Sequence, residues 1–189
     1  MKTKRFTHSL TLLNALLLVT GLNAQNNRIM KTTSALNAPE GKVIHQSRLL
    51  YTEILINASP DSVWKVLTDF KTYKAWNPFI TSLEGNPAVG EHIHVFLQPP
   101  GAKGMAFKPK VLVNEKAREF RWIGQFIIPR LFDGEHGFRL IDNGNGTTTF
   151  QQFERFRGLL VPFLKKMLNT NTRQGFEDMN KALKQRVEG

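Results

Sequence analysis

The sequence contains no cysteine, and several familiar catalytic signatures are missing as well. Without cysteine the protein has no disulfide bond, thiolate metal site, cysteine nucleophile or lipid-modified N-terminal cysteine. No Gly-rich loop leads into a helical pattern, so the sequence lacks a nucleotide-binding motif. No serine lies in a Gly-x-Ser-x-Gly context, and nucleophilic hydrolysis is therefore unsupported.

Acidic residues are few: 15 Asp and Glu stand against 26 Lys and Arg, a formal net charge of +11. Such an excess favours anionic partners, although it also promotes solubility. The aromatic residues are 14 Phe with only 3 Trp and 2 Tyr, which indicates apolar walls more than hydrogen-bonding platforms. Because these aromatics do not interleave with Lys and Arg, we expect no nucleic-acid partner.

Residues 1–24 have the pattern of a secretory signal peptide. A basic start at residues 1–5 precedes a Leu-rich stretch at 10–19, which is shorter than the ~20 residues of a membrane span. Ala24 offers a small residue for cleavage, so we expect a periplasmic or secreted protein. The alternative is a start at Met30, which would give a cytoplasmic protein.

Polar residues 25–47 have no periodicity and predict a linker, and residues 48–189 predict one folded domain. Alternating and helical patterns predict a strand, two short helices, a series of strands and a long C-terminal helix at 159–187. The expected strands are 50–57, 92–97, 107–114, 119–126, 134–142 and 147–156. This order predicts an α+β fold with one antiparallel sheet and helices on one side.

Several stretches carry a family resemblance: 58–64 (ASPDSVW), 67–70 (LTDF), 76–80 (WNPFI), 132–138 (FDGEHGF), 154–162 (ERFRGLLVP) and 175–184 (GFEDMNKALK). Together they resemble the polyketide cyclase/dehydrase and lipid-transport-like branch of the SRPBCC superfamily, which includes START domains and birch-pollen-allergen-like proteins. The resemblance implies a helix-grip fold, in which a curved seven-stranded antiparallel sheet wraps around the C-terminal helix and encloses a hydrophobic cavity. It does not imply one activity, and the predicted signal peptide is a departure from the family pattern.

The cavity face of the last two strands is predicted from their arginines. Arg139, Arg155 and Arg157 should face outward, because arginine is seldom buried. A turn at Gly144 would place His136 opposite Gln152, and a one-residue slip would exchange the faces. The predicted wall consists of His136, Phe138, Phe150, Gln152 and Glu154, extended on the preceding strand by Phe120, Trp122 and Phe126.

The long helix is expected to supply the opposite wall. Residues 169–172 and Gly175 interrupt its apolar stripe with small and polar side chains, which would leave space and hydrogen-bonding groups. Asn171, Thr172, Gly175 and Met179 should therefore face the sheet across the cavity. Its mouth is expected at the loops 99–105 and 127–132.

His136, Gln152 and Glu154 have three open interpretations: an internal hydrogen-bond network, orientation of a ligand's polar group, or acid–base catalysis. We assign no catalytic residue. His92 and His94 share a strand face, but no third ligand lies at a recognisable spacing, so we expect neither a metal nor another cofactor.

The sequence favours a protein that binds or carries a hydrophobic small molecule such as a lipid, fatty acid, quinone or polyketide-like compound. The alternatives are a cyclase/dehydratase-type enzyme that uses His136 or Glu154 as acid or base, and an interaction protein with a filled core. Basic residues beside apolar ones on the long helix could contact an anionic membrane or simply be solvated. These residues are Phe163, Lys165, Lys166, Met167 and Arg173.

Overall fold

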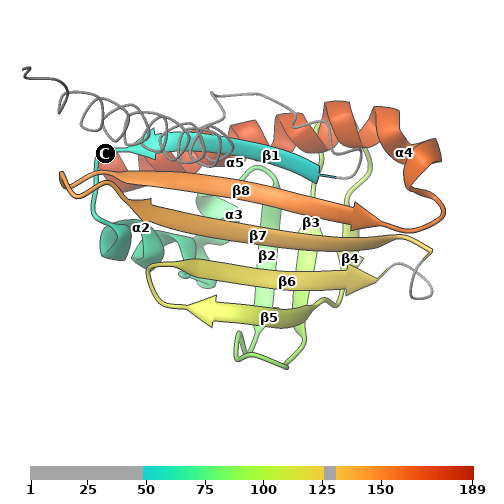
Figure 1. Ribbon diagram of the computed structural model, residues 1–189, viewed down its shortest axis with the longest axis horizontal. Helices are drawn as coiled ribbons and strands as arrows, with labels where there is room; N and C mark the ends of the chain where they lie inside the picture. Colours follow the sequence, from blue (N-terminus) through green and yellow to red (C-terminus); the bar gives the residue numbers. More distant parts are fainter. Residues whose placement is uncertain (1–48, 126–130) are drawn as a thin grey trace, which may run out of the picture. The chain divides into compact units, whose positions relative to one another are not determined.

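The computed structural model describes residues 49–125 and 131–189 (Figure 1). The predicted signal peptide and linker lie outside the described residues. The strands are β1 (Leu49–Ile56), β2 (Ile80–Gly85), β3 (Ile93–Leu97), β4 (Met105–Phe107), β5 (Lys110–Glu115), β6 (Glu119–Gln125), β7 (Asp133–Asp142) and β8 (Thr148–Arg157). The helices are α2 (Pro60–Leu67), the 3-10 helix η1 (Phe70–Thr72), α3 (Tyr73–Trp76), α4 (Val161–Met167), the π-helix η2 (Leu168–Thr172) and α5 (Arg173–Glu188).

The strands form two antiparallel sheets, so the expected single seven-stranded sheet is wrong. The larger sheet has the order β1-β8-β7-β6-β5 and the smaller one β2-β3-β4, and their strands cross steeply in Figure 1. The strand predicted at 107–114 is divided between the two sheets at Pro109, which has no N–H to donate to a ladder. The two sheets are connected next to β3 and β5, where Ile93 N donates to the Pro109 carbonyl (3.0 Å) and Val111 N to the Glu91 carbonyl (2.8 Å).

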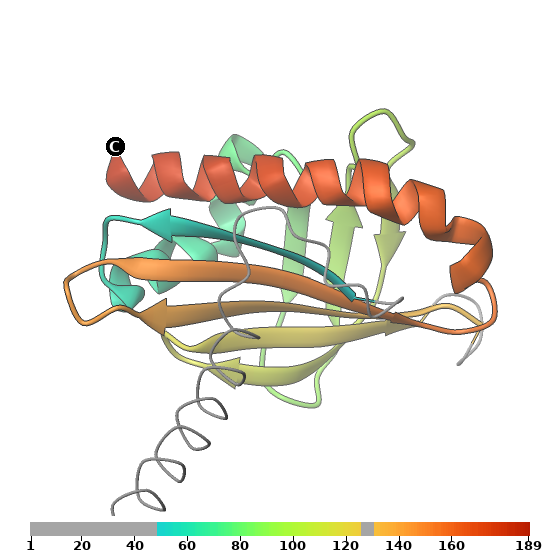
Figure 2. The same ribbon diagram turned by 45° about the horizontal axis from the view of Figure 1, so that its top comes forward.

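The C-terminal helix extends along β1 and above the larger sheet (Figure 2). It runs without a break from Val161 to Glu188, but its turns at residues 168–172, where the apolar stripe is interrupted, form the π-helix η2 between α4 and α5. The buried side of α5 carries Phe176, Met179 and Leu183. At its far end, the backbone N–H of Asn57 donates to the Glu188 carboxylate (2.6 Å) and lowers its pKa. Among the described residues, no helix is long and apolar enough to cross a membrane.

The β7–β8 register differs from the expected one by two residues. His136 lies opposite Glu154, while Gln152 lies opposite Phe138. The hairpin turns one residue later than predicted, and the Asp142 carboxylate accepts a hydrogen bond from Gly144 N (2.9 Å). A two-residue shift preserves the faces, so the arginines of both strands are exposed as predicted.

Local signals start the first short helix and end the second as expected. The Ser59 side chain accepts from Ser62 N (3.3 Å), and Pro60 occupies the first helical turn of α2. The second short helical segment ends at Asn77, whose side-chain oxygen accepts from the N–H groups of Phe79 and Ile80 (3.0 and 2.8 Å). This turn directs Phe79 into the core, where it is 1% exposed.

Candidate functional site

A cavity of about 150 Å³ lies where the smaller sheet, the ends of β6 to β8 and the π-helix η2 meet. Its lining is mainly apolar, with Lys103, Gln125, Glu154, Asn171 and Thr172 as the polar side chains. The apolar side of the lining comes from Phe79, Leu97, Pro99, Ala102, Met105, Ala106, Phe107, Phe132, Phe156 and Leu168, together with Gly124 and Gly134. The loop 99–105 thus contributes to the lining, while most of the second expected mouth segment lies outside the described residues.

Two glycines form one wall of the cavity, because Gly124 of β6 lies directly opposite Gly134 of β7. A Cβ on Gly134 would lie 2.4 Å from Oε1 of Glu154, and one on Gly124 would lie 3.2 Å from the Phe107 ring. The space above these backbones is therefore occupied by the carboxylate and the ring. A glycine in a strand pattern often marks such a close approach, a signal that the sequence analysis did not use for Gly134.

Glu154 belongs to a buried polar chain that begins at the cavity. Its Oε2 lies 3.6 Å from Nδ1 of His136, and Nε2 of His136 lies 3.4 Å from the Gln152 amide nitrogen. The same nitrogen lies 3.6 Å from the Met179 sulfur. When the Gln152 amide donates to Nε2, the neutral imidazole carries its proton on Nδ1, which faces the Glu154 carboxylate.

His136 is enclosed by aromatic rings and is only 4% exposed. It stacks on Trp122 with 4.7 Å between ring centroids, and Phe138 and Phe176 contact it edge-on at 4.8 and 5.1 Å. His136 does not line the cavity itself. The arrangement makes it a positioning residue that can act on a ligand only through Glu154.

On the helix side, Asn171 and Thr172 line the cavity in different ways. The Asn171 amide donates to the Pro100 carbonyl (2.8 Å), and its side-chain oxygen accepts from the Thr170 hydroxyl (2.7 Å). The hydrogen bond from Asn171 to Pro100 therefore holds the 99–104 loop against η2. Thr172 is 9% exposed, and its hydroxyl has no hydrogen-bond partner in the described part of the chain.

Gly175 does not provide the space that the sequence led us to expect. A Cβ there would lie 2.2 Å from the Phe79 ring, so Phe79 fills this position. The polar interruption still has a counterpart in a cavity, but one helical turn earlier, at Leu168, Asn171 and Thr172. The sequence did not indicate Phe79, because the turn at Asn77 that directs it inward depends on tertiary packing.

The structure places the predicted site residues that it describes, apart from Gly175 against the Phe79 ring, in the cavity lining, in the polar chain or in the core. Glu154, Asn171 and Thr172 line the cavity, while His136, Gln152 and Met179 lie in the polar chain behind it. Phe126 lies outside the described residues. The aromatic residues Phe120, Trp122, Phe138 and Phe150 are buried in the core, as are two cavity residues that the sequence analysis missed, Phe79 and Phe156.

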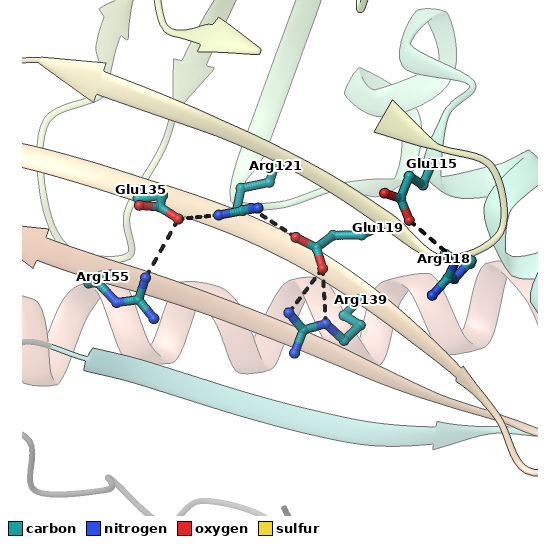
Figure 3. A network of polar contacts seen from close by, with 7 residues as sticks. All are labelled: Glu115, Arg118, Glu119, Arg121, Glu135, Arg139 and Arg155. Atoms are coloured by element: carbon teal, nitrogen blue, oxygen red, sulfur yellow. Dashed lines mark hydrogen bonds and ion pairs between the residues drawn. The ribbon is translucent and has the colours of Figure 1, made fainter. Parts of the chain in front are cut away.

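The outer face of the larger sheet carries a chain of ion pairs across β6, β7 and β8 (Figure 3). Glu135 accepts from Arg121 (2.6 Å) and lies 3.7 Å from Arg155, while Glu119 accepts from Arg139 (2.9 Å). Arg121 Nε also lies 2.8 Å from Glu119, an ion pair whose geometry does not make a hydrogen bond. Burial lowers the pKa of Arg121, but Glu135 and Glu119 outweigh it and raise the pKa. These pairs hold the arginines outward and support the register that places Glu154 at the cavity.

No group of three or more metal-ligating side chains occurs within residues 49–125 and 131–189. His92 and His94, the pair considered as metal ligands, are both exposed near or on β3. The polar groups that could contact a ligand are therefore those of the cavity lining, among them the Glu154 carboxylate and the Thr172 hydroxyl.

The α+β arrangement, an antiparallel sheet with a long C-terminal helix and a cavity between them, is consistent with a helix-grip fold of the START/Bet v 1-like superfamily. Residues 48–188 match the family model described as "Polyketide cyclase / dehydrase and lipid transport". The chain belongs to this family. No curated protein matches its sequence.

Solved structures show the same fold at low sequence identity. The chain is similar to the Zhui aromatase/cyclase from Streptomyces sp. R1128, with a TM-score of 0.61, 15% identity, and coverage of 75% of this chain and 93% of that one. It is also similar to a START superfamily protein from Mycobacterium smegmatis, with a TM-score of 0.58, 21% identity, and coverage of 75% and 97%. At these identities the likeness concerns the fold alone.

Proposed function

We propose that the protein binds a hydrophobic small molecule in the cavity lined by η2 and the glycine pair of β6 and β7. The observation that carries the proposal is an apolar lining with a carboxylate and a hydroxyl that have unused hydrogen-bonding capacity. Apolar walls with a few polar groups are the usual composition of small-molecule sites. Family membership supports the same conclusion, because the family includes lipid transport.

The cavity volume limits the part of the ligand that is enclosed. A cavity of about 150 Å³ is the size that holds a benzene-sized molecule and is smaller than the ~300 Å³ at which typical ligand pockets begin. A single ring or a short acyl segment fits without rearrangement. A whole lipid, fatty acid or quinone would have to displace the 99–104 loop, which Asn171 holds at Pro100 and Gln98 holds at Ala102 (3.0 Å).

Burial of apolar surface would supply most of the affinity. An aromatic ring buries ~150 Å² or more, which at ~25 cal/mol per Å² corresponds to roughly 4 kcal/mol before the costs of association. The polar groups would then determine the orientation of the ligand and contribute less to its affinity.

Native mass spectrometry of the protein purified from its own host tests the proposal, because a bound ligand would add a defined mass. A matched pair of variants sharpens the test. Ala102→Trp would fill the cavity and abolish the adduct, whereas Ala88→Trp, at an exposed turn, would retain it. A protein that carries no adduct and binds no apolar probe would contradict the proposal.

An acid–base enzyme of the cyclase/dehydratase type is the second candidate, favoured by the Glu154 carboxylate at the cavity with His136 behind it. Carboxylate and imidazole side chains are common general acids and bases. Chemical conversion of the co-purified compound, lost in Glu154→Gln while binding persists, would support this candidate. Loss of binding alone would support a carrier.

Two further properties are part of the proposal. Leu159, in the turn before α4, and Phe163, on α4, are 78% and 82% exposed, which would suit peripheral contact with a membrane. The N-terminal pattern supports export after cleavage at Ala24, which N-terminal sequencing of the mature protein would test.

A further inference from the structure

Two polar groups at the cavity wall have hydrogen-bonding capacity that the described residues do not use. Glu154 contacts His136 through Oε2 at 3.6 Å, while Oε1 lies over the bare backbone of Gly134 without a hydrogen-bond partner in the described part. The hydroxyl of Thr172 is likewise unpaired there, although the residue is nine-tenths buried. Both residues line the cavity, so a polar group that arrives with a ligand can form hydrogen bonds with them.

The chemistry of the two groups differs, and the difference restricts the ligand. An ionised carboxylate only accepts hydrogen bonds, whereas a threonine hydroxyl can both donate and accept. A ligand hydroxyl satisfies both at once, since it can donate to Glu154 and accept from Thr172. A ligand carboxylate would face the Glu154 charge across a poorly solvated space, where like charges repel strongly.

We infer that the cavity selects an apolar ring or short chain that carries a hydroxyl group, bound jointly by Glu154 and Thr172. This inference rests on the proposed function and names the ligand class for the same cavity. His136 serves as the positioning residue, because its Nδ1–H faces Oε2 and leaves Oε1 for the ligand. Gly134 is required as well, since any side chain there would displace that oxygen.

Lys103 is the other charged group of the lining, and it lies on the exposed 99–104 loop. Its ammonium group can reach water, so it is suited to the mouth of the cavity and not to the enclosed end. An acidic ligand could be attracted there, and the experiment must separate this alternative from recognition by Glu154.

The test compares three probes of one ring size on the purified protein by NMR titration: p-cresol, toluene and 4-methylbenzoate. We expect p-cresol to bind about tenfold more tightly than toluene, because its hydroxyl hydrogen-bonds a charged group, and 4-methylbenzoate to bind most weakly. Glu154→Gln should remove about tenfold of the p-cresol affinity, and Thr172→Val a few-fold, with toluene affinity unchanged. Glu91→Gln, at an exposed turn, is the matched control and should change neither.

Three other results would contradict the inference, and one of them would also contradict the proposed function. Toluene binding without a preference for p-cresol would overturn the inference and leave the proposed function intact. Failure of all three probes to bind would contradict the proposed function and the inference with it. Preferred binding of 4-methylbenzoate that Lys103→Gln abolishes would show an acid-selective cavity and also overturn the inference.

Discussion

The ring of Phe79 lies against the backbone of Gly175, so that a Cβ added to this glycine would be only 2.2 Å from Phe79 Cδ2. In an exposed helix, replacement of glycine by alanine stabilises by about 1 kcal/mol. Here the added methyl would overpack the core, which costs typically ~1–3 kcal/mol. We therefore expect Gly175→Ala to lower the free energy of unfolding by about 1–2 kcal/mol in urea denaturation.

A double-mutant cycle identifies the cause of that loss. Phe79→Leu should relieve much of the overpacking, so the two substitutions together should cost less than the sum of their separate costs. Lys181→Ala on the exposed side of α5 is the control and should change stability by no more than ~0.5 kcal/mol. A Gly175→Ala protein more stable than the parent would show that the Phe79 ring does not occupy this space.

The two cavity glycines should give different results when each is replaced by alanine. At Gly134 the methyl would displace the Glu154 carboxylate, so p-cresol affinity should fall several-fold while toluene affinity changes little. At Gly124 the methyl would press on the Phe107 ring and narrow the apolar part of the cavity, so the affinities for p-cresol and toluene should fall together. NMR titration measures the affinity of each variant for p-cresol and for toluene. If the two variants changed these affinities in the same way, Gly124 and Gly134 would not have distinct roles.

Much of the fold follows from the sequence because alternation along the strands is strong. Val95 of β3 is buried between exposed neighbours, and the arginines of β7 and β8 assign their outer faces. The sequence did not predict β2, since a bulge between Ile80 and Ser82 interrupts its alternation. It also merged β4 with β5, because the three residues of β4 are too few to show a period.

The site was predictable in composition but not in position. The face that carries Glu154 follows from the arginines, yet its partner across β7 depends on a turn whose centre the sequence leaves uncertain by one residue. The polar interruption of the helix predicted Thr172 as a site residue, and Thr172 lines the cavity. Gly175 had two explanations, a space or a tightly packed ring. Only the tertiary position of Phe79 decides between them.

Alkaline pH should destabilise the protein through Tyr73. This residue is fully buried and donates to the Leu67 carbonyl, and burial raises the pKa of its phenol. A group whose pKa is raised on folding stabilises fully below its unfolded pKa of about 10 and loses that contribution as the pH rises. Above this pH, Tyr73 should reduce the free energy of unfolding by up to ~1.4 kcal/mol per pH unit.

Tyr73→Phe isolates this effect. At neutral pH the variant should lose about 1 kcal/mol with the hydrogen bond to Leu67. Its stability should then fall less steeply above pH ~10. Urea denaturation at a series of pH values measures both, with Tyr51→Phe as a comparison, since burial and Glu53 also raise the pKa of Tyr51. Parallel pH profiles for the parent and Tyr73→Phe would contradict the role of Tyr73.

Contact with an anionic membrane should depend on Phe163 and Leu159, which project from α4 and its approach with 82% and 78% exposure. Lys166 follows Phe163 on α4 and is exposed, so anionic lipid headgroups would complement this surface. We expect Phe163→Ser to weaken sedimentation with vesicles containing phosphatidylserine several-fold, and added salt to weaken binding of the parent. Phe96→Ser, an exposed phenylalanine on β3, is the matched control and should bind as the parent does. Equal binding to vesicles of neutral lipid alone would show that the positive charge contributes nothing, and equal loss in both variants would show that α4 is not the contact surface.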